Sequence, residues 1–337
     1  MNDTTDKRVP AWLWGGVTVV VVGVVAVLAL SDRRPEPPDT YRLNLDPYEQ
    51  VDPALVTFRE TGRIAPEIEH LRGLAVGPDD SIYVAGENTV MAYDLDGAEA
   101  ARLPVDGTPD CLAVTPDGEI LLGMRTHVRV LDAGGSLTSV WDAPGENVYI
   151  TSIAADMENV YVADAGNRVV LRYDRDGDLL ARLGEEDAGR GIPGLIIPSP
   201  YFDVAFDNRG ALWVANTGRH GLENYRGNGD LVSAWYRPSI RVEGFCGCCN
   251  PAHIAFRGDG SLVTAEKGVA RVKVYSVDQT LDGFVAQPTA FADTSAGAVD
   301  PDLESPLRDL AVDSRNRVLV LDSRRNAVRI FEEKEGA

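Results

Sequence analysis

The chain of 337 residues contains 33 glycines and 20 prolines, and its 52 acidic against 32 basic side chains give a formal net charge of −20. Because affinity for nucleic acid depends on clustered Lys and Arg, this charge argues against a nucleic-acid partner, and it disfavours docking on an anionic lipid surface. We also expect no nucleotide cofactor.

One long apolar segment lies near the start of the chain. Residues 11–30 (AWLWGGVTVVVVGVVAVLAL) carry no charge and follow a polar tail at residues 1–10. As a helix this run spans a hydrocarbon core of ~30 Å, and its tryptophans suit the membrane boundary. A cleaved signal peptide is the alternative, but the run is longer than a usual signal-peptide core and no clear small-x-small site follows. The sequence therefore favours one uncleaved transmembrane helix.

The charges that flank this helix are nearly balanced, with Lys7 and Arg8 before it and Arg33 and Arg34 after it. The positive-inside rule therefore says little about orientation. Since a short tail ahead of a large domain usually stays inside, we expect a single-pass membrane protein with its domain on the extracytoplasmic side, periplasmic or extracellular. Residues 31–54 form a linker whose Pro-rich start is a stiff spacer.

The rest of the chain consists of a repeated unit. Each copy has a short apolar strand, an Asp/Gly turn, a second strand, a variable loop, a third strand and a turn into a fourth. The six copies begin at Leu71, Pro109, Ile150, Tyr201, Pro251 and Leu307. Four-stranded units repeated at this spacing are typical of propeller blades. The sequence thus predicts an all-β, six-bladed β-propeller of four-stranded blades over residues 55–333.

The strings of the repeat resemble the NHL-repeat family. The segment Asp164–Val169 (DAGNRV) is close to that family's hallmark, and the resemblance covers roughly Leu55 to Phe331. It implies a six-bladed propeller, and it says little about function because one fold hosts many activities.

The two ends of the repeat region predict how the ring closes. The sixth copy stops at Phe331, after its third strand. The segment Leu55–Arg63 (LVTFRETGR) lies before the first copy and alternates like a strand. We expect it to serve as the outer strand of the last blade, which removes an open edge.

Blade topology places the chemically distinctive residues on one face. Because the four strands of a blade run antiparallel, connections between blades and loops between second and third strands emerge on the same side. All the histidines and cysteines map there: His70, His127, His220, His253, Cys111, Cys246, Cys248 and Cys249. The long connections 184–200, 237–250 and 286–305 do too, although they could merely cover the channel mouth.

Equivalent positions in the six inner strands should ring the central channel. These positions are Gly73, Cys111, Ser152, Asp203, His253 and Asp309. Asp203, His253 and Asp309 come from consecutive blades, so we expect them to converge. Polar residues also line any water-filled channel, so a purely structural ring is an equal interpretation.

The motif Cys246-x-Cys248-Cys249 places three sulfurs within four residues. With Cys111 as a fourth thiolate it would suit an iron–sulfur cluster, and with His253 it would suit zinc. The spacing matches neither ferredoxin runs nor zinc ribbons. A disulfide, between Cys246 and Cys249 or between Cys248 and Cys249, is the redox alternative. An inert loop is the third possibility.

Other residues of this face are candidate ligand-binding groups. Lys267 could pair with an anionic ligand or cluster, and His127 and His220 could serve as acid/base or binding residues. Lys273, in the third strand of the fifth copy, is expected to be solvated or packed along its stem.

Three functions are compatible with these features. The first is an anchored extracytoplasmic module that binds a protein partner or small ligand, or carries a metal or redox centre, on its cysteine-rich face. The second is a metal-dependent lyase or lactonase-like hydrolase, since related six-bladed propellers include such enzymes with a channel metal held by His and carboxylates. Asp203, His253 and Asp309 would then be the ligands. The third is a purely structural interaction scaffold.

Overall fold

A computed structural model describes residues 50–292 and 305–336. The chain divides into two compact units, Met1–Leu45 and Asp46–Ala337, and every described residue lies in the second. The predicted anchor at residues 11–30, the tail before it and most of the linker lie outside the described residues. Within the described ranges, none of the helices has the length and apolar character needed to span a bilayer.

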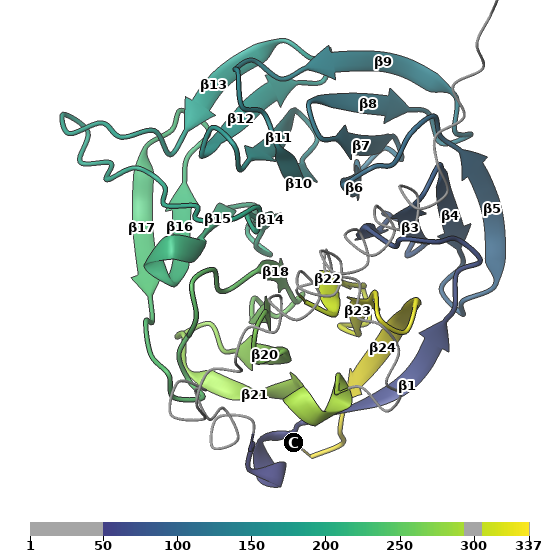
Figure 1. Cartoon of the computed structure of the whole chain (residues 1–337), viewed down its shortest axis with the longest axis vertical. Helices are drawn as coiled ribbons and strands as arrows, with labels where there is room; N and C mark the ends of the chain where they lie inside the picture. The colour runs from purple at the N-terminus through teal and green to yellow at the C-terminus, as the bar shows by residue number, and fades with distance from the viewer. Residues whose placement is uncertain (1–49, 293–304, 337) are drawn as a thin grey trace, which may run out of the picture. The chain divides into compact units, whose positions relative to one another are not determined.

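Six four-stranded antiparallel sheets are arranged around a central axis (Figure 1). Blade 1 contains β2 (Gly73–Val76), β3 (Ile82–Gly86), β4 (Thr89–Tyr93) and β5 (Glu99–Pro104). Blade 2 contains β6 (Cys111–Val114), β7 (Ile120–Met124), β8 (His127–Leu131) and β9 (Leu137–Asp142). Blade 3 contains β10 (Ile150–Ala155), β11 (Asn159–Asp164), β12 (Val169–Asp174) and β13 (Leu179–Leu183).

The second half of the ring repeats this order. Blade 4 contains β14 (Val204–Phe206), β15 (Leu212–Asn216), β16 (Gly221–Tyr225) and β17 (Leu231–Tyr236). Blade 5 contains β18 (His253–Phe256), β19 (Leu262–Glu266), β20 (Arg271–Tyr275) and β21 (Leu281–Ala286). Blade 6 contains β22 (Leu307–Val312), β23 (Val318–Asp322), β24 (Ala327–Glu333) and β1 (Phe58–Ile64). Short 3-10 turns lie at η2 (Pro53–Leu55), η3 (Thr217–Arg219) and η4 (Pro288–Ala290). The predicted all-β fold of six four-stranded blades is confirmed.

The predicted closure of the ring is also confirmed. β1 pairs antiparallel with β24, with Phe58 opposite Glu333 and Ile64 opposite Val328. The start of the propeller thus supplies the outer strand of the last blade, and the two strands are neighbours in Figure 1. An ion pair of 2.5 Å between Glu60 and Arg329 crosses this junction.

Burial within a blade follows the position of each strand. The second and third strands are almost wholly buried, as in β7, β11 and β20, because they are covered by blades on both sides. The outer strands β5, β9, β13 and β17 each bury only their fifth residue, namely Leu103, Trp141, Leu183 and Trp235. The one buried side chain anchors each outer strand to its blade, and the other side chains of that strand are at least partly exposed to solvent.

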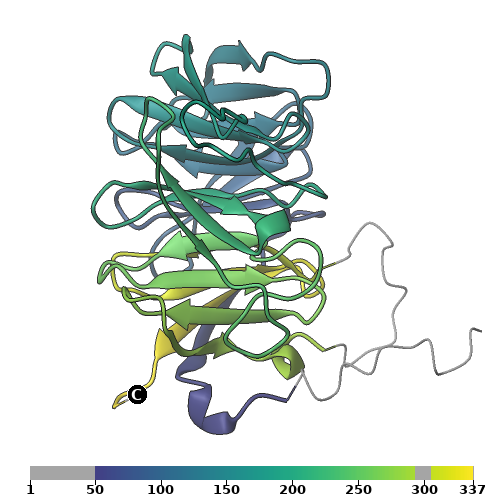
Figure 2. The same cartoon turned by 90° about the vertical axis from the view of Figure 1, so that its left-hand side faces the viewer.

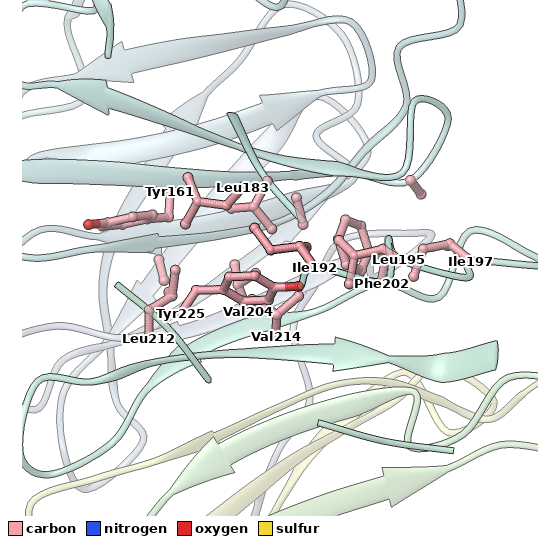
Figure 3. Packing of buried hydrophobic residues seen from close by; sticks show 14 residues of the cluster. Tyr161, Leu183, Ile192, Leu195, Ile197, Phe202, Val204, Leu212, Val214 and Tyr225 are labelled. Atoms are coloured by element: carbon pink, nitrogen blue, oxygen red, sulfur yellow. The ribbon is translucent and has the colours of Figure 1, made fainter. Parts of the chain in front are cut away.

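The hydrophobic cores lie between neighbouring blades, which Figure 2 shows edge-on. Between blades 3 and 4, the long connection before β14 adds Ile192, Leu195 and Ile197 to the strand residues, among them Val204 and Tyr161 (Figure 3). This elaborated loop therefore has a packing role, because its apolar side chains complete an inter-blade core.

Candidate functional site

Five of the six predicted ring positions line one channel cavity of about 230 Å³. They are Cys111, Ser152, Asp203, His253 and Asp309. At the sixth, Gly73, an added Cβ would lie 2.9 Å from Leu112 Cδ2 and 3.0 Å from the Leu112 nitrogen. Blade 1 carries glycine there because the inner strand of blade 2 approaches closely.

The Asp203 carboxylate joins three blades. It accepts hydrogen bonds from Ser152 Oγ of blade 3 at 2.5 Å and from the backbone N–H of Ile254 of blade 5 at 2.7 Å. Burial raises the pKa of Asp203 to about 6, against the lowering effect of these donors. At neutral pH the group is therefore mainly a buried carboxylate held by its donors.

Asp309 makes the equivalent link between blades 6 and 1. It accepts hydrogen bonds of 2.8 Å from the backbone N–H groups of Leu74 and Leu310. Burial, followed by the charge of Asp203, holds the pKa of Asp309 well above its usual range. The two carboxylates therefore have a structural role, because each links neighbouring blades. Ionising both at once is unfavourable, because their negative charges repel each other in a buried site.

His253 lies between these carboxylates. Its Nδ1 is 3.9 Å from Asp203 Oδ2 and 4.0 Å from Asp309 Oδ1, too far for a hydrogen bond. Its Nε2 is buried and has no hydrogen-bond partner among the described residues. Burial, and then the charge of Arg308, lower the pKa of His253 to about 3. The side chain of His253 is therefore a neutral imidazole at the floor of the channel mouth, able to accept or donate one hydrogen bond.

Above this floor opens a cavity of about 470 Å³, which we call the mouth cavity. Its lining is Arg72, Asp110, Arg125, Tyr149, Thr151, Ser199, Pro200, Tyr201, His253 and Arg308. Three arginines against one aspartate leave a formal charge of +2, with the histidine neutral. This local sign is opposite to the net charge of −20 of the chain.

The arginines of the mouth cavity are held in defined positions. Arg72 Nη1 lies 3.5 Å from Asp110 Oδ1, and the Arg125 guanidinium lies 4.1 Å from the centre of the Tyr149 ring. Burial raises the pKa of Asp110, while the arginines act to lower it. Sequence reasoning missed this cluster, because its members come from the ends of separate repeats and share no motif.

Lys267 lies beside the same cavity, since its Nζ is 4.3 Å from the centre of the Tyr201 ring. His127 begins β8 and His220 follows η3, at the face where they were predicted. Neither histidine is part of the mouth-cavity lining or of the channel lining. Of the three candidate ligand-binding residues, Lys267 alone contacts a residue of the mouth-cavity lining, Tyr201.

Cys111 is placed apart from the other cysteines. It belongs to the core between blades 2 and 3, where a Cβ added to Gly123 would meet its Sγ at 2.4 Å. Burial raises the pKa of Cys111 well above its usual range. Its sulfur therefore fills the space that Gly123 leaves, which is a packing role, and its role as a fourth thiolate stays a prediction.

The cysteine-rich loop, residues 245–251, borders the mouth cavity. Ser199 Oγ donates a 2.8 Å hydrogen bond to Cys249 Sγ, and the Cys249 and Cys248 sulfurs are 3.2 Å apart. Asn250 ties the loop to blade 5, because its side chain accepts from Lys267 N at 2.8 Å and donates to Cys246 O at 2.6 Å.

The predicted metal ligands are not among the groups of described residues whose ligand atoms converge, so the metal site stays a prediction. Among the described residues, one group of three possible ligands (His, Cys, Asp or Glu) has all its ligand atoms within 4.8 Å of one another. Its members are Glu69, His70 and Glu87, and all three are exposed. The five predicted ligands, Cys246, Cys248, Cys249, Cys111 and His253, do not meet this condition in any combination of three. In this arrangement they do not fit a closed zinc or iron–sulfur site, which needs convergent ligands.

A buried ion cluster lies under the cysteine-rich loop. Glu266, Arg271 and Lys273 each have fully buried side chains, and Glu266 pairs with Arg271 at 2.9 Å and with Lys273 at 2.5 Å. The Lys273 ammonium also donates to the carbonyls of Val242 and Gly244, at 3.2 and 2.8 Å. The expectation of a solvated or stem-packed Lys273 was wrong, because its charged end is buried and bound to Glu266 and to the backbone just before the loop.

Comparison with solved structures finds the same fold in virginiamycin B lyase and in a streptogramin B lyase. Virginiamycin B lyase from Staphylococcus aureus has a TM-score of 0.56 at 13% identity, covering 82% of this chain and 100% of that one. A streptogramin B lyase gives 0.55 at 14%, covering 84% and 100%. A catalytically inactive variant of the S. aureus enzyme with quinupristin gives 0.52 at 14%, covering 82% and 87%.

No protein-family profile matches the chain, and comparison with curated proteins finds no match either. The resemblance to NHL repeats therefore stays a prediction. At the identities of the solved structures the likeness concerns the fold alone. The chain shares the six-bladed propeller fold of these lyases.

Proposed function

We propose that this propeller binds a small anionic molecule in the mouth cavity, on the face that carries the cysteine-rich loop. The observation that carries the proposal is the formal charge of +2 in the lining of a cavity of about 470 Å³. Its volume suits a small organic ligand. Guanidinium groups bind carboxylates and phosphates through two parallel hydrogen bonds, so three arginines around one cavity favour an anionic ligand.

The experiment is a titration of the purified full-length chain with inorganic phosphate and with citrate, followed by calorimetry at low and high salt. Arg125→Gln should weaken binding by at least about 10-fold, since one charge-assisted hydrogen bond contributes roughly 1.5–3 kcal/mol. Arg59→Gln, an exposed position on β1, is the matched control and should bind like the unmodified chain. Saturable binding that Arg125→Gln leaves unchanged, or the failure of both anions to bind, would overturn the proposal.

A lyase or hydrolase acting on such a ligand is the second candidate. It is favoured by the unpartnered, buried Nε2 of His253 at the cavity floor, which can exchange a hydrogen bond with a substrate. The lyase names of the fold neighbours support the choice of reaction class by analogy. The test is incubation with virginiamycin B and with simple lactones. Turnover that persists in His253→Ala, or no turnover of either class, would eliminate this candidate and leave anion binding intact.

We further propose that residues 11–30 anchor the propeller to a membrane and place it outside the cytoplasm. The support is the uncharged run of the sequence, which is long enough for a ~30 Å hydrocarbon core. A metal or redox role for the cysteine-rich loop is also retained as a proposal. The spacing of its sulfurs supports thiol chemistry better than a closed metal site.

A further inference from the structure

Three side chains with metal-ligating atoms converge at the start of blade 1. Glu69 and His70 lie in the connection that leads from β1 into β2, and Glu87 directly follows β3. One ligand atom of each residue lies within 4.8 Å of the other two, and His70 Nε2 is 4.0 Å from Glu87 Oε2. All three side chains are exposed, so an ion can reach them from solvent.

The backbone around these side chains is held in place. The Glu87 N–H donates a 3.0 Å hydrogen bond to the carbonyl of Glu69, and the Asn326 side chain of blade 6 donates to the carbonyl of Ile68 at 3.0 Å. Ile68 and Leu71, which flank the two ligating residues of the connection, are 8% and 2% exposed. The ligands therefore project from an ordered backbone, which lowers the entropic cost of binding.

The charge and the ligand types favour a divalent transition metal. Two carboxylates give the group a formal charge of −2, with histidine counted as neutral. An imidazole nitrogen suits Zn²⁺, whereas Mg²⁺ and Ca²⁺ prefer oxygen ligands alone. Zn²⁺ binds nitrogen and oxygen at ~2.0–2.2 Å, so the ligand atoms of a tetrahedral site are about 3.4 Å apart. The present spacing of up to 4.8 Å can close by small rotations of exposed side chains.

We propose that Glu69, His70 and Glu87 bind a Zn²⁺ ion, with water completing its coordination. The ion joins the connection between β1 and β2 to the loop between β3 and β4. Because β1 is the outer strand of blade 6 and β2 the inner strand of blade 1, this connection is where the closing strand leads into the first blade. None of the three ligands lines the mouth cavity, so the proposal is independent of anion binding there.

The test measures histidine modification at His70 in the full-length chain. Diethyl pyrocarbonate labels accessible imidazole nitrogens, and peptide mass spectrometry follows the label on His70 while a metal buffer sets the free Zn²⁺ concentration. Zinc bound elsewhere, for example by cysteines, does not enter this readout. Zn²⁺ in the micromolar range should suppress labelling of His70, because ligation occupies its nitrogen, and Mg²⁺ at the same concentration should not. Labelling of His70 that Zn²⁺ does not change, or equal protection by Mg²⁺, overturns the proposal without any variant.

Two variants distinguish a three-ligand site from zinc on a single histidine. Glu69→Gln and Glu87→Gln should each raise the Zn²⁺ concentration for half protection at least about 10-fold, since even residues that only support a ligand contribute about 10–100-fold to metal affinity. Glu67→Gln is the matched control, because it removes the same charge from the same connection at a side chain that is 86% exposed and outside the group. It should leave the midpoint unchanged. A midpoint that either ligand variant leaves unchanged, or that Glu67→Gln shifts as much, would indicate an adventitious ion only and overturn the proposal.

Discussion

The Asp203 carboxylate accepts a 2.7 Å hydrogen bond from the backbone N–H of Ile254, and this bond joins blade 4 to β18 of blade 5. The corresponding bond from Leu74 to Asp309 joins blade 1 to blade 6. Polar residues at one level of the channel thus connect the inner strands of neighbouring blades. The backbone hydrogen bonds of the sheets, by contrast, run within each blade. The structural interpretation of the ring is therefore compatible with its proposed use as the floor of a binding site.

Asp203→Asn is expected to destabilise the propeller by about 1–3 kcal/mol. The new amide cannot accept from Ser152 on one side and Ile254 on the other, so one buried donor loses its partner. Denaturant unfolding of the variant measures the loss. Asp178→Asn, at an exposed position, is the control and should change the free energy of unfolding by less than ~0.5 kcal/mol. Equal stability of the two variants would contradict a structural role for the carboxylate.

The channel also predicts a pH dependence, in which the contribution of His253 opposes that of the buried carboxylates Asp203 and Asp309. His253 has a folded pKa of about 3 against 6.5 as its reference, so the unfolded chain binds more protons between these values and stability falls as the pH falls through this window. Asp203 has a folded pKa of about 6 against 3.8, so its contribution rises as the pH falls from 6 toward 3.8.

His253→Gln removes the first contribution. Relative to the unmodified chain, this variant should lose about 2 kcal/mol less stability between pH 7 and pH 5. Asp203→Asn removes the contribution of Asp203, so this variant should lose about 1 kcal/mol more stability than the unmodified chain between pH 7 and pH 5. Unfolding by denaturant at the two pH values measures both. Parallel pH profiles for all three proteins would show that neither group titrates as its burial indicates.

The fold could be predicted from the sequence because its information is local and repeated. Six copies fix the number of blades, and the missing strand after Phe331 together with the strand-like segment from Leu55 fixes the closure. The ring positions also follow from the alignment of the copies. Each copy repeats the same strand pattern, so an error in one strand does not alter the architecture.

The chemistry of the face that carries the cysteine-rich loop could be predicted less well from the sequence, because it depends on distances between residues of different blades. Cys111 and the cysteine-rich loop share a face in the topology, yet Cys111 packs against Gly123 in a different inter-blade core. Lys273 alternates like a solvent-facing strand residue, and only the fold shows that its ammonium is bound by the carbonyls of Val242 and Gly244. The cations of the mouth cavity likewise converge only in three dimensions.

The proposed anchor predicts how the chain partitions. The full-length protein should remain with membranes after alkaline carbonate extraction, since an apolar helix of this length inserts stably. A chain that begins at Gln50 should stay in the supernatant. Protease added to intact cells or spheroplasts should digest the propeller if it lies outside the cytoplasm. Release of the full-length chain by carbonate, or an N-terminus that starts after residue 30, would instead indicate a cleaved signal peptide.

Ring closure depends on the packing of β1, which makes Phe58 a sensitive position. Its side chain is 3% exposed and shares a core with Phe331 and Phe291, between the last blade and blade 5. Phe58→Ala should destabilise the propeller by about 3–5 kcal/mol, because it leaves a cavity where β1 meets the ring.

Arg59→Ala, on the same strand but exposed, is the matched control and should stay within ~0.5 kcal/mol. Denaturant unfolding measures both changes. Removal of β1 altogether should uncover the edge of β24 and produce concentration-dependent association, because an unpaired strand is a template for pairing with another chain. A monomeric, equally stable protein without β1 would show that the ring does not need the strand that closes it.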